Sequence, residues 1–144
     1  MSLKDGLKKM SKSDVSDLSR INLTDSKDQI INKIKKAKTD SLPMPSTSGE
    51  LNDRPEALNL IGIFSSLNNS SLEETIKTFS GKNFSDFKNS LSQLVVDKIN
   101  PISQEIKRLI NDSSYLDQIL SDGSIKAQEI ASQKIKKIHE IIGF

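Results

Sequence analysis

The sequence predicts a mostly α-helical fold, and two observations lead to that expectation. From residue 54 onward, apolar side chains recur three and four positions apart in one segment after another, which is the period of helices with a buried face. Residues that start or stop helices, such as Pro55, Gly81 and Gly123, separate these segments. No series of alternating polar and apolar residues predicts a sheet, and no internal repeat is evident.

Residues 1–20 are polar and rich in Ser and Lys, so we expect them to be flexible. The alternation of polar and apolar residues at 20–23 predicts a short extended segment. Thr24 and Asp25 are of the types that begin a helix, and we expect this helix to end near Lys38. Its apolar face is expected to consist of Ile30, Ile31, Ile34 and Ala37, with lysines on the opposite face.

Residues 39–53 contain two prolines, a glycine and clustered Ser, Thr and Asp, which is typical of a loop or linker. We therefore divide the chain into residues 1–40, a linker at residues 41–53 and a helical region at residues 54–144.

The first helix of that region begins at Pro55, which is tolerated in a first turn. It is apolar on most sides, so we expect it to be buried centrally. A capping box within residues 70–74 predicts a short helix that ends near Phe79.

The next helix carries Phe84 and Phe87 on its apolar face, and Pro101 is expected to end or kink it. A short helix at residues 115–120 follows. The final helix is expected at residues 124–142, where seven Ile and Ala residues occupy one broad face.

The composition excludes several classes of site. The chain has 144 residues, enough for one domain with or without an attached segment, and it has no cysteine, so disulfides and thiolate metal sites are excluded. The absence of cysteine fits an intracellular location, and we expect a cytoplasmic protein. No apolar run approaches the length of a membrane span, so no membrane partner is expected.

The basic residues are concentrated at the amino-terminal end. Residues 1–40 hold ten Lys and Arg against six Asp and Glu, whereas the remainder holds eleven against thirteen. The helical region is therefore not the strongly basic body of a non-specific nucleic-acid binder.

The sharpest motif is Lys9-Met10-Ser11-Lys12-Ser13. Two lysines three positions apart among short hydroxyl side chains can close over a polyphosphate and follow its charge towards a leaving group, for which a compact cation on a flexible stem is suited. For an isolated pair of lysines, a solvated tail would be the commoner explanation.

The complete pentapeptide matches the signature loop of class I aminoacyl-tRNA synthetases. The order of the segments after it resembles the carboxy-terminal portion of bacterial-type tryptophanyl-tRNA synthetases over essentially the whole chain. The segments that carry this resemblance are residues 19–25, 36–41, 54–60, 79–88 and 141–144. Tyrosyl enzymes share the loop but differ after it.

The resemblance implies that the loop binds ATP and helps to form tryptophanyl-adenylate. Lys9 and Lys12 correspond to its catalytic lysines, and Met10, Ser11 and Ser13 complete the ATP-binding set. The resemblance implies no metal site in this chain. In the full enzyme, Mg²⁺ accompanies ATP. Residues 54–144 then form a helical anticodon-binding bundle for tRNA(Trp). The last helix is expected to pack on a Rossmann-like catalytic domain, of which residues 1–40 are a remnant, in a homodimeric enzyme.

The chain also departs from that family. The partner signature, a His-x-Gly-His type motif, and the tryptophan pocket lie upstream in the family, and the single histidine here is His139. We therefore expect this piece to be inactive alone. The alternative is a stand-alone helical module that binds RNA or protein, with a vestigial loop.

Four further groups have both a functional and a structural interpretation. His139 is expected to be an exposed helix residue rather than an acid–base catalyst. Asp14 and Asp17 either orient the loop lysines or a metal, or balance charge in solvent. A cluster of lysines either contacts RNA phosphates or forms a solvated helix face; it consists of Lys33, Lys35, Lys36 and Lys38. Three phenylalanines are expected in the core: Phe64, Phe84 and Phe87.

Overall fold

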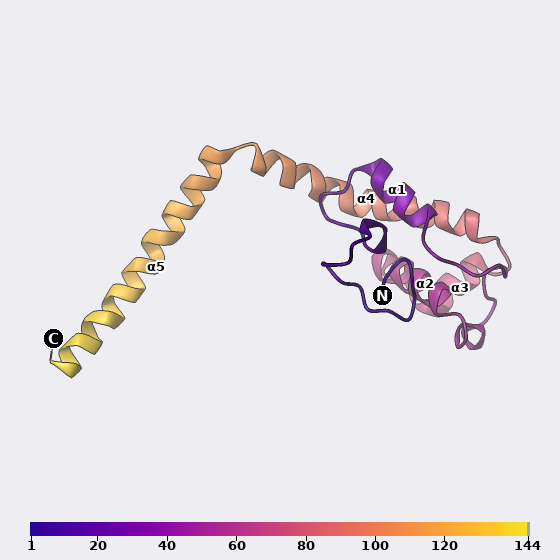
Figure 1. The fold of residues 1–144 in the computed structure, drawn as a ribbon, viewed down its shortest axis with the longest axis horizontal. Helices are drawn as coiled ribbons and strands as arrows, with labels where there is room; N and C mark the ends of the chain where they lie inside the picture. The colour runs from indigo at the N-terminus through magenta and orange to yellow at the C-terminus, as the bar shows by residue number, and fades with distance from the viewer. Residues whose placement is uncertain (144) are drawn as a thin grey trace. The chain divides into compact units, whose positions relative to one another are not determined.

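The computed structural model describes residues 1–143, and helices dominate them (Figure 1). Five α-helices and two short 3₁₀ helices follow one another: η1 (Asp17–Ser19), α1 (Lys27–Lys35), η2 (Ser48–Leu51), α2 (Pro55–Asn68), α3 (Leu72–Phe79), α4 (Phe84–Ile110) and α5 (Ser113–Ile142). Within residues 1–143 the only sheet-like pairing is an isolated bridge between Ser2 and Asp5. The predicted mostly α-helical fold is confirmed.

The chain forms two compact units, Met1–Gln104 and Glu105–Phe144, and the division falls inside α4. The segment expected as a linker, residues 41–53, lies within the first unit. Its Met44 is buried and exchanges backbone hydrogen bonds with Gly81 and Lys82, so the segment is part of the packed structure.

Helix α1 begins later than the sequence suggested. Ser26 is its N-cap, and the Ser26 hydroxyl and the Gln29 side chain each bond the other residue's backbone N–H in a capping box. Asp25 is therefore free to turn inward, where it is 4% exposed. Before it, Arg20 has the expected extended backbone, but a turn at Asn22–Asp25 follows rather than a strand.

Helices α2 and α3 have the predicted ends. Pro55 occupies the first turn of α2, and Asn69 ends it in a left-handed conformation with φ of 53°. Ser71 and Glu74 form the predicted capping box of α3. Helix α2 is buried along one side only, since Leu58 is 43% exposed, so the expectation of a centrally buried helix was wrong.

The core of the first unit lies between α1, α2, α3 and the first half of α4. Phe64, Phe79 and Phe87 meet at its centre, with ring centroids 5.0 to 5.9 Å apart, and Phe84 lies 6.4 Å from Phe87. Edge-to-face contacts of this kind add to the stabilisation from burial. The phenylalanines predicted for the core are therefore confirmed.

Arg54 joins the segment before α2 to this core. Its guanidinium forms two hydrogen bonds of 2.8 Å with the Asp40 carboxylate and a third with the Pro43 carbonyl, and it lies 5.7 Å from the Phe84 ring. Burial alone would raise the pKa of Asp40, but hydrogen bonds from Arg54 and the Leu42 N–H hold it below its usual range.

Helix α4 continues through Pro101, so that residue does not end it. Asp112 caps α5 by accepting a hydrogen bond from the Tyr115 N–H, and α5 then runs unbroken through Gly123. Two helices with a break at residues 121–123 were expected, and that expectation was wrong because an isolated glycine inside a helix costs only about 1 kcal/mol.

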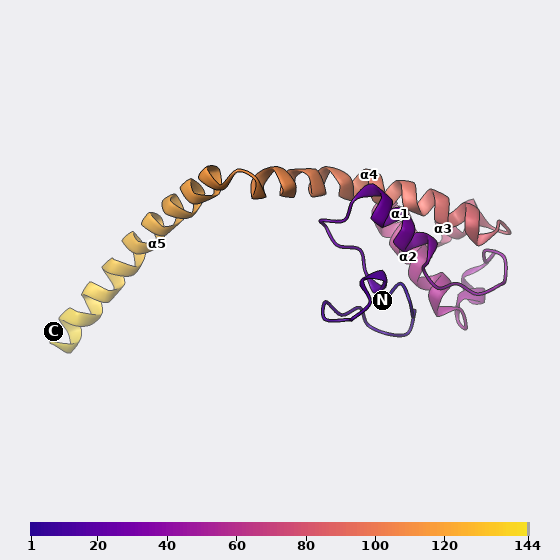
Figure 2. The ribbon, with the colours of Figure 1, turned by 45° about the horizontal axis from the view of Figure 1, so that its top comes forward.

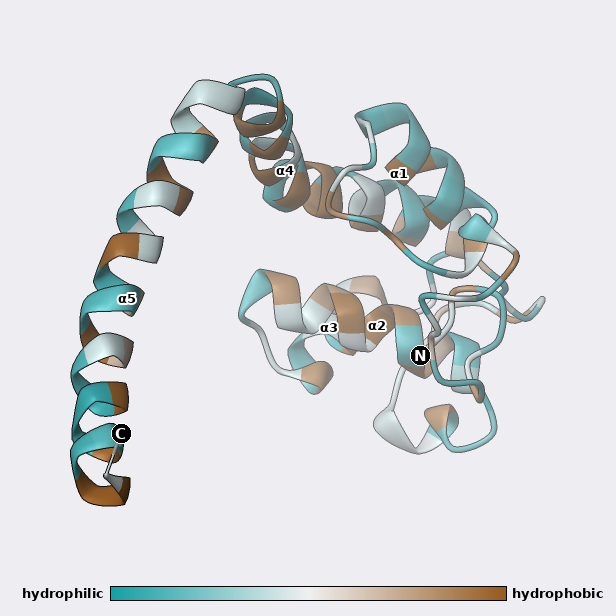
Figure 3. Cartoon of the chain, turned by 60° about the vertical axis from the view of Figure 1, so that its left-hand side comes forward, coloured by the Kyte–Doolittle hydropathy of each residue, from teal (hydrophilic) through white to brown (hydrophobic). Residues whose placement is uncertain are grey.

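No residue of α5 is buried, and hydrophobic residues recur along it from turn to turn (Figure 3). Among residues 1–143, no helix has both the length and the apolar composition needed to cross a membrane.

Candidate functional site

The loop that carries Lys9 to Ser13 is closed at its base by backbone hydrogen bonds. The Ser2 N–H donates to the Lys8 carbonyl over 2.8 Å, and the Leu3 N–H donates to the Ser19 carbonyl over 2.9 Å. The Leu3 carbonyl accepts from the Lys38 N–H over 2.8 Å. These bonds attach the base to the end of α1, so residues 1–8 are more ordered than their polar composition suggested.

Gly6 packs the loop base directly against the first turn of α2, and both ribbon views show the loop beside that helix (Figures 1 and 2). A Cβ at Gly6 would lie 2.4 Å from the Pro55 carbonyl carbon. The adjacent Glu56 binds Lys38 over 2.7 Å. A hydrogen bond from Lys38, opposed by burial and assisted by the N–H groups of Glu56 and Gly6, lowers the pKa of Glu56.

Ser11 to Asp14 form a tight turn with Lys12 and Ser13 at its two middle positions. The Asp14 N–H donates to the Ser11 carbonyl over 3.4 Å. The Ser13 N–H donates to the Ser11 hydroxyl oxygen over 3.3 Å, and the two serine hydroxyls lie 3.0 Å apart. The turn therefore presents the second lysine of the motif and two hydroxyls together.

Lys9, Met10, Lys12 and Ser13 are exposed. Over the described part of the chain, neither Lys9 nor Lys12 forms an ion pair with the protein. Two lysine ammonium groups without protein carboxylates can therefore receive an anionic ligand.

A chain of charged side chains connects this turn to α1. The Arg20 guanidinium donates to the Asp14 carbonyl over 3.1 Å and, more weakly, to the Ser11 carbonyl over 3.5 Å. Arg20 pairs with Asp17 at 3.3 Å, and Asp17 pairs with Lys33 of α1 at 2.6 Å.

Lys33 is buried at 3% exposure and also contacts Asp25 at 2.6 Å. Asp25 is further bound by the Asn22 N–H and side-chain amide. The placement of Lys33 on a solvated face was therefore wrong: a buried lysine needs carboxylate partners, and Asp17 and Asp25 supply them.

The two acidic residues beside the motif act within the scaffold. Asp17 contacts Lys33, Arg20 and Asn22 rather than the loop lysines, and hydrogen bonds from Lys33 and Asn22 lower its pKa. Asp14 accepts a hydrogen bond from the Ser16 N–H.

Lys35, Lys36 and Lys38 are exposed, and Lys38 binds Glu56 as described. The end of α1 is instead capped from α4, where the Lys88 ammonium donates to the Ala37 and Lys35 carbonyls over 2.6 and 3.2 Å. Burial lowers the pKa of Lys88.

The remaining candidates are the single histidine and possible metal ligands. His139 is exposed on α5, as expected. Within residues 1–143, no group of three or more His, Cys, Asp or Glu side chains could hold a metal ion.

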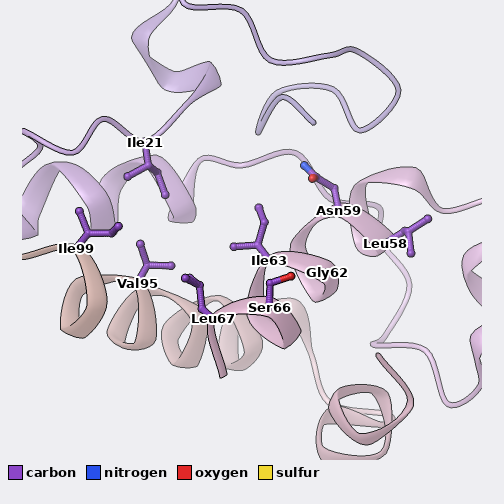
Figure 4. A pocket seen from close by; sticks show the side chains of 9 residues that line it. All are labelled: Ile21, Leu58, Asn59, Gly62, Ile63, Ser66, Leu67, Val95 and Ile99. Carbon is purple, nitrogen blue, oxygen red and sulfur yellow. The ribbon is translucent and has the colours of Figure 1, made fainter. Parts of the chain in front are cut away.

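An apolar groove of about 580 Å³ lies along α2 (Figure 4). Its walls come from the segment before α1, from one side of α2 and from α4, and they are Ile21, Leu58, Asn59, Gly62, Ile63, Ser66, Leu67, Val95 and Ile99. Because none of these lining residues is charged, the groove does not suit a polyphosphate.

Arg20 and Lys33 are the important residues that the sequence analysis did not assign to the site. A signal for Lys33 was present, because it lies three positions after Ile30 and four before Ala37, on the apolar face of α1. No sequence signal predicted the contacts of Arg20 with the turn.

Comparisons with known proteins show the family of the chain. The family described as "tRNA synthetases class I (W and Y)" has a sequence model that matches residues 1–99. The chain belongs to this family of class I tRNA synthetases.

Several tryptophan–tRNA ligases are similar to this chain over its whole length. The tryptophan–tRNA ligases of Rhizobium meliloti and Brucella melitensis are 51% and 49% identical over all 144 residues, and that of Rickettsia conorii is 47% identical. A tryptophanyl-tRNA synthetase structure from Mycoplasma pneumoniae matches 75% of this chain and 34% of its own, with a TM-score of 0.61 and 27% identity. The predicted resemblance is confirmed, and the chain spans 41 to 43% of the length of these three ligases.

Proposed function

We propose that this chain supplies the ATP-phosphate loop and the tRNA-binding helices of a tryptophan–tRNA ligase. The observation that carries the proposal is the exposed turn of the motif, in which Lys12 and Ser13 project from a base anchored on α1 and α2. The similarity to the tryptophan–tRNA ligases over the whole chain supports it.

In the proposed reaction, a tryptophan carboxylate oxygen attacks the α-phosphorus of ATP, and the bond to the bridging oxygen of pyrophosphate breaks. Negative charge then grows on the pyrophosphate. Lys9 and Lys12 would attract that charge, and their flexible stems would allow the ammonium groups to follow it. The hydroxyls of Ser11 and Ser13 and the backbone at Met10 complete the proposed contact surface.

Mg²⁺ would enter on the polyphosphate, because the donor sets of residues 1–143 do not fit a resident ion. Asp14 and Asp17 are already engaged by the Ser16 N–H and by Lys33. We assign no step of the reaction to protein-bound metal.

The remaining parts of the proposal concern partners. Residues 54–144 would contact tRNA(Trp), and the apolar face of α5 would pack on a catalytic domain within the part of the enzyme that this chain does not cover, in a cytoplasmic homodimer. The exposed isoleucines of α5 support this packing, since Ile130 is 67% exposed and Ile141 is 83% exposed.

The test is tryptophan-dependent exchange of pyrophosphate into ATP. We would use a chimera in which this chain replaces the matching 144 residues of the Rhizobium meliloti ligase. Lys12→Ala is expected to slow exchange about 100-fold, as loss of one preorganised charge contact does, whereas the exposed Lys27→Ala control should not. The chain alone should show no exchange, and equal rates for Lys12→Ala and the unaltered chimera would refute the role of the loop.

The second candidate function is a stand-alone module that binds RNA or protein. The observation in its favour is that Met1–Gln104 forms a core from its own residues, including Phe87, Ile30 and Leu60. An inactive but well-folded chimera that leaves RNA binding by this chain intact would favour that candidate.

A further inference from the structure

We propose that Arg20 is a positioning residue for the phosphate loop, and this inference rests on the proposed function. Arg20 does not contact the ligand. Its guanidinium holds the carbonyls of Ser11 and Asp14, the two residues that flank Lys12 and Ser13. Holding both ends of the turn fixes the direction in which its two middle residues project.

The turn has little else to hold it in place. Its own closing bond, from the Asp14 N–H to the Ser11 carbonyl, is long at 3.4 Å. Most neighbouring side chains are exposed, and Val15 beside it is completely exposed. The guanidinium is therefore the main polar contact between the turn and the rest of the first unit.

Arg20 is itself held by a rigid element. Asp17 binds it at 3.3 Å, and Asp17 is bound in turn by the buried Lys33 at 2.6 Å and by the Asn22 amide at 2.9 Å. Lys33 lies within α1. Two ion pairs, Lys33–Asp17 and Asp17–Arg20, therefore connect the turn to a helix of the core and hold it in position. A loop that is placed before the ligand arrives loses less conformational entropy on binding.

The geometry requires an arginine. A guanidinium has several N–H donors in a fixed plane, so it can bridge two carbonyls while it also pairs with a carboxylate. In Arg20, Nη1 donates to both carbonyls while Nη2 pairs with Asp17. A lysine could keep the ion pair with Asp17, but its single nitrogen cannot take the positions of both Nη1 and Nη2. The Arg20→Lys variant therefore separates the clamp from the charge.

The experiment uses the chimera introduced above and measures pyrophosphate exchange at varied ATP and at varied tryptophan. Arg20→Ala is expected to lower kcat/KM for ATP on the order of tenfold, the loss typical of hydrogen bonds to a charged group, with the KM for tryptophan unchanged. Arg20→Lys should restore only a minor part of the kcat/KM for ATP that Arg20→Ala loses. Asp17→Asn should lower kcat/KM for ATP less than Arg20→Ala does. The exposed Lys27→Ala is the control.

A second measurement reports the loop directly. Trypsin cleaves after Lys9 and Lys12, and mass spectrometry gives the rate at these bonds relative to bonds elsewhere in the same molecule. Arg20→Ala should raise the relative rate at both, and bound ATP should reduce it.

The outcomes separate this inference from the proposed function. If Lys12→Ala leaves exchange unchanged, the proposed function fails. If Lys12→Ala slows exchange but Arg20→Ala changes neither the kinetics for ATP nor the cleavage, the positioning role is overturned while the function stands. Full activity of Arg20→Lys would likewise overturn the clamp and leave only charge balance with Asp17.

Discussion

Replacing Lys33 with methionine removes a buried cation while it keeps the length of the side chain. Lys33 is 3% exposed and lies 2.6 Å from both Asp17 and Asp25. The methionine would retain the apolar contacts of the stem within the core. The change therefore isolates the loss of the charge.

The expected loss of unfolding free energy depends on the hydrogen bonds and the solvent contact that Asp17 and Asp25 keep after the substitution. Asp17 is 53% exposed at its side chain, so water replaces much of what it loses. Asp25 is 4% exposed and keeps only the bonds from the Asn22 N–H and amide, at 2.8 and 3.3 Å. Breaking a buried pair costs roughly 3–5 kcal/mol, and the remaining Asn22 bonds place this case at the lower end, about 3 kcal/mol.

The assay is amide hydrogen exchange, because it reports the stability of the first unit residue by residue. The slowest amides of α1 and α2 report the free energy of unfolding of the first unit. The control is Lys36→Met, at an exposed position near the end of the same helix. Its free energy of unfolding should stay within about 0.5 kcal/mol of that of the unaltered chain. A loss below about 1 kcal/mol in Lys33→Met would refute the assignment of a buried ion pair, as would an equal loss in both variants.

Three further predictions concern other parts of the chain. Gly6→Ala should destabilise the first unit by about 1–3 kcal/mol in thermal melts, because its Cβ meets the backbone of α2, and an unchanged melt would show that the loop base does not dock there. Despite burial, Arg54 holds the pKa of Asp40 below its usual value of 3.8. The resulting contribution to the free energy of unfolding is present above pH 3.8 and is lost as the pH falls through the lower folded-state pKa. In urea unfolding, the free energy of unfolding of Asp40→Asn should therefore fall less on acidification than that of the unaltered chain. Helix α5 should cause concentration-dependent self-association in sedimentation, reduced by Ile130→Lys but not by Ser132→Lys on its polar side, and a monomer at every concentration would contradict this.

Local sequence was sufficient where an element depends on its own residues. The Ser71–Glu74 capping box and Pro55 placed the starts of α3 and α2, because caps and first turns are satisfied within a few residues. The motif at Lys9 to Ser13 was found because its five residues are contiguous and match a family signature. Its turn is closed by bonds among its own atoms.

Local signals failed where two of them competed. Asp25 and Ser26 are both suitable N-caps, and only Ser26 has a glutamine three positions later, so Ser26 caps α1 and Asp25 binds Lys33. Gly123 is a helix breaker by type, yet α5 continues through it. One glycine inside a helix costs about 1 kcal/mol, whereas a break would create two new helix ends whose backbone N–H and C=O groups need other partners.

The sequence by itself determined the helical content and the family, and it located the loop motif, since periodicity, capping and a contiguous motif all act over short distances along the chain. Only the tertiary structure decided how the loop is held. Arg20 reaches back to Ser11 and Asp14, and Asp17 reaches forward to Lys33, so residues distant in sequence meet in one ion-pair chain. Such contacts depend on the direction in which packed helices and turns place their side chains, and the order of residues in a segment does not contain that information.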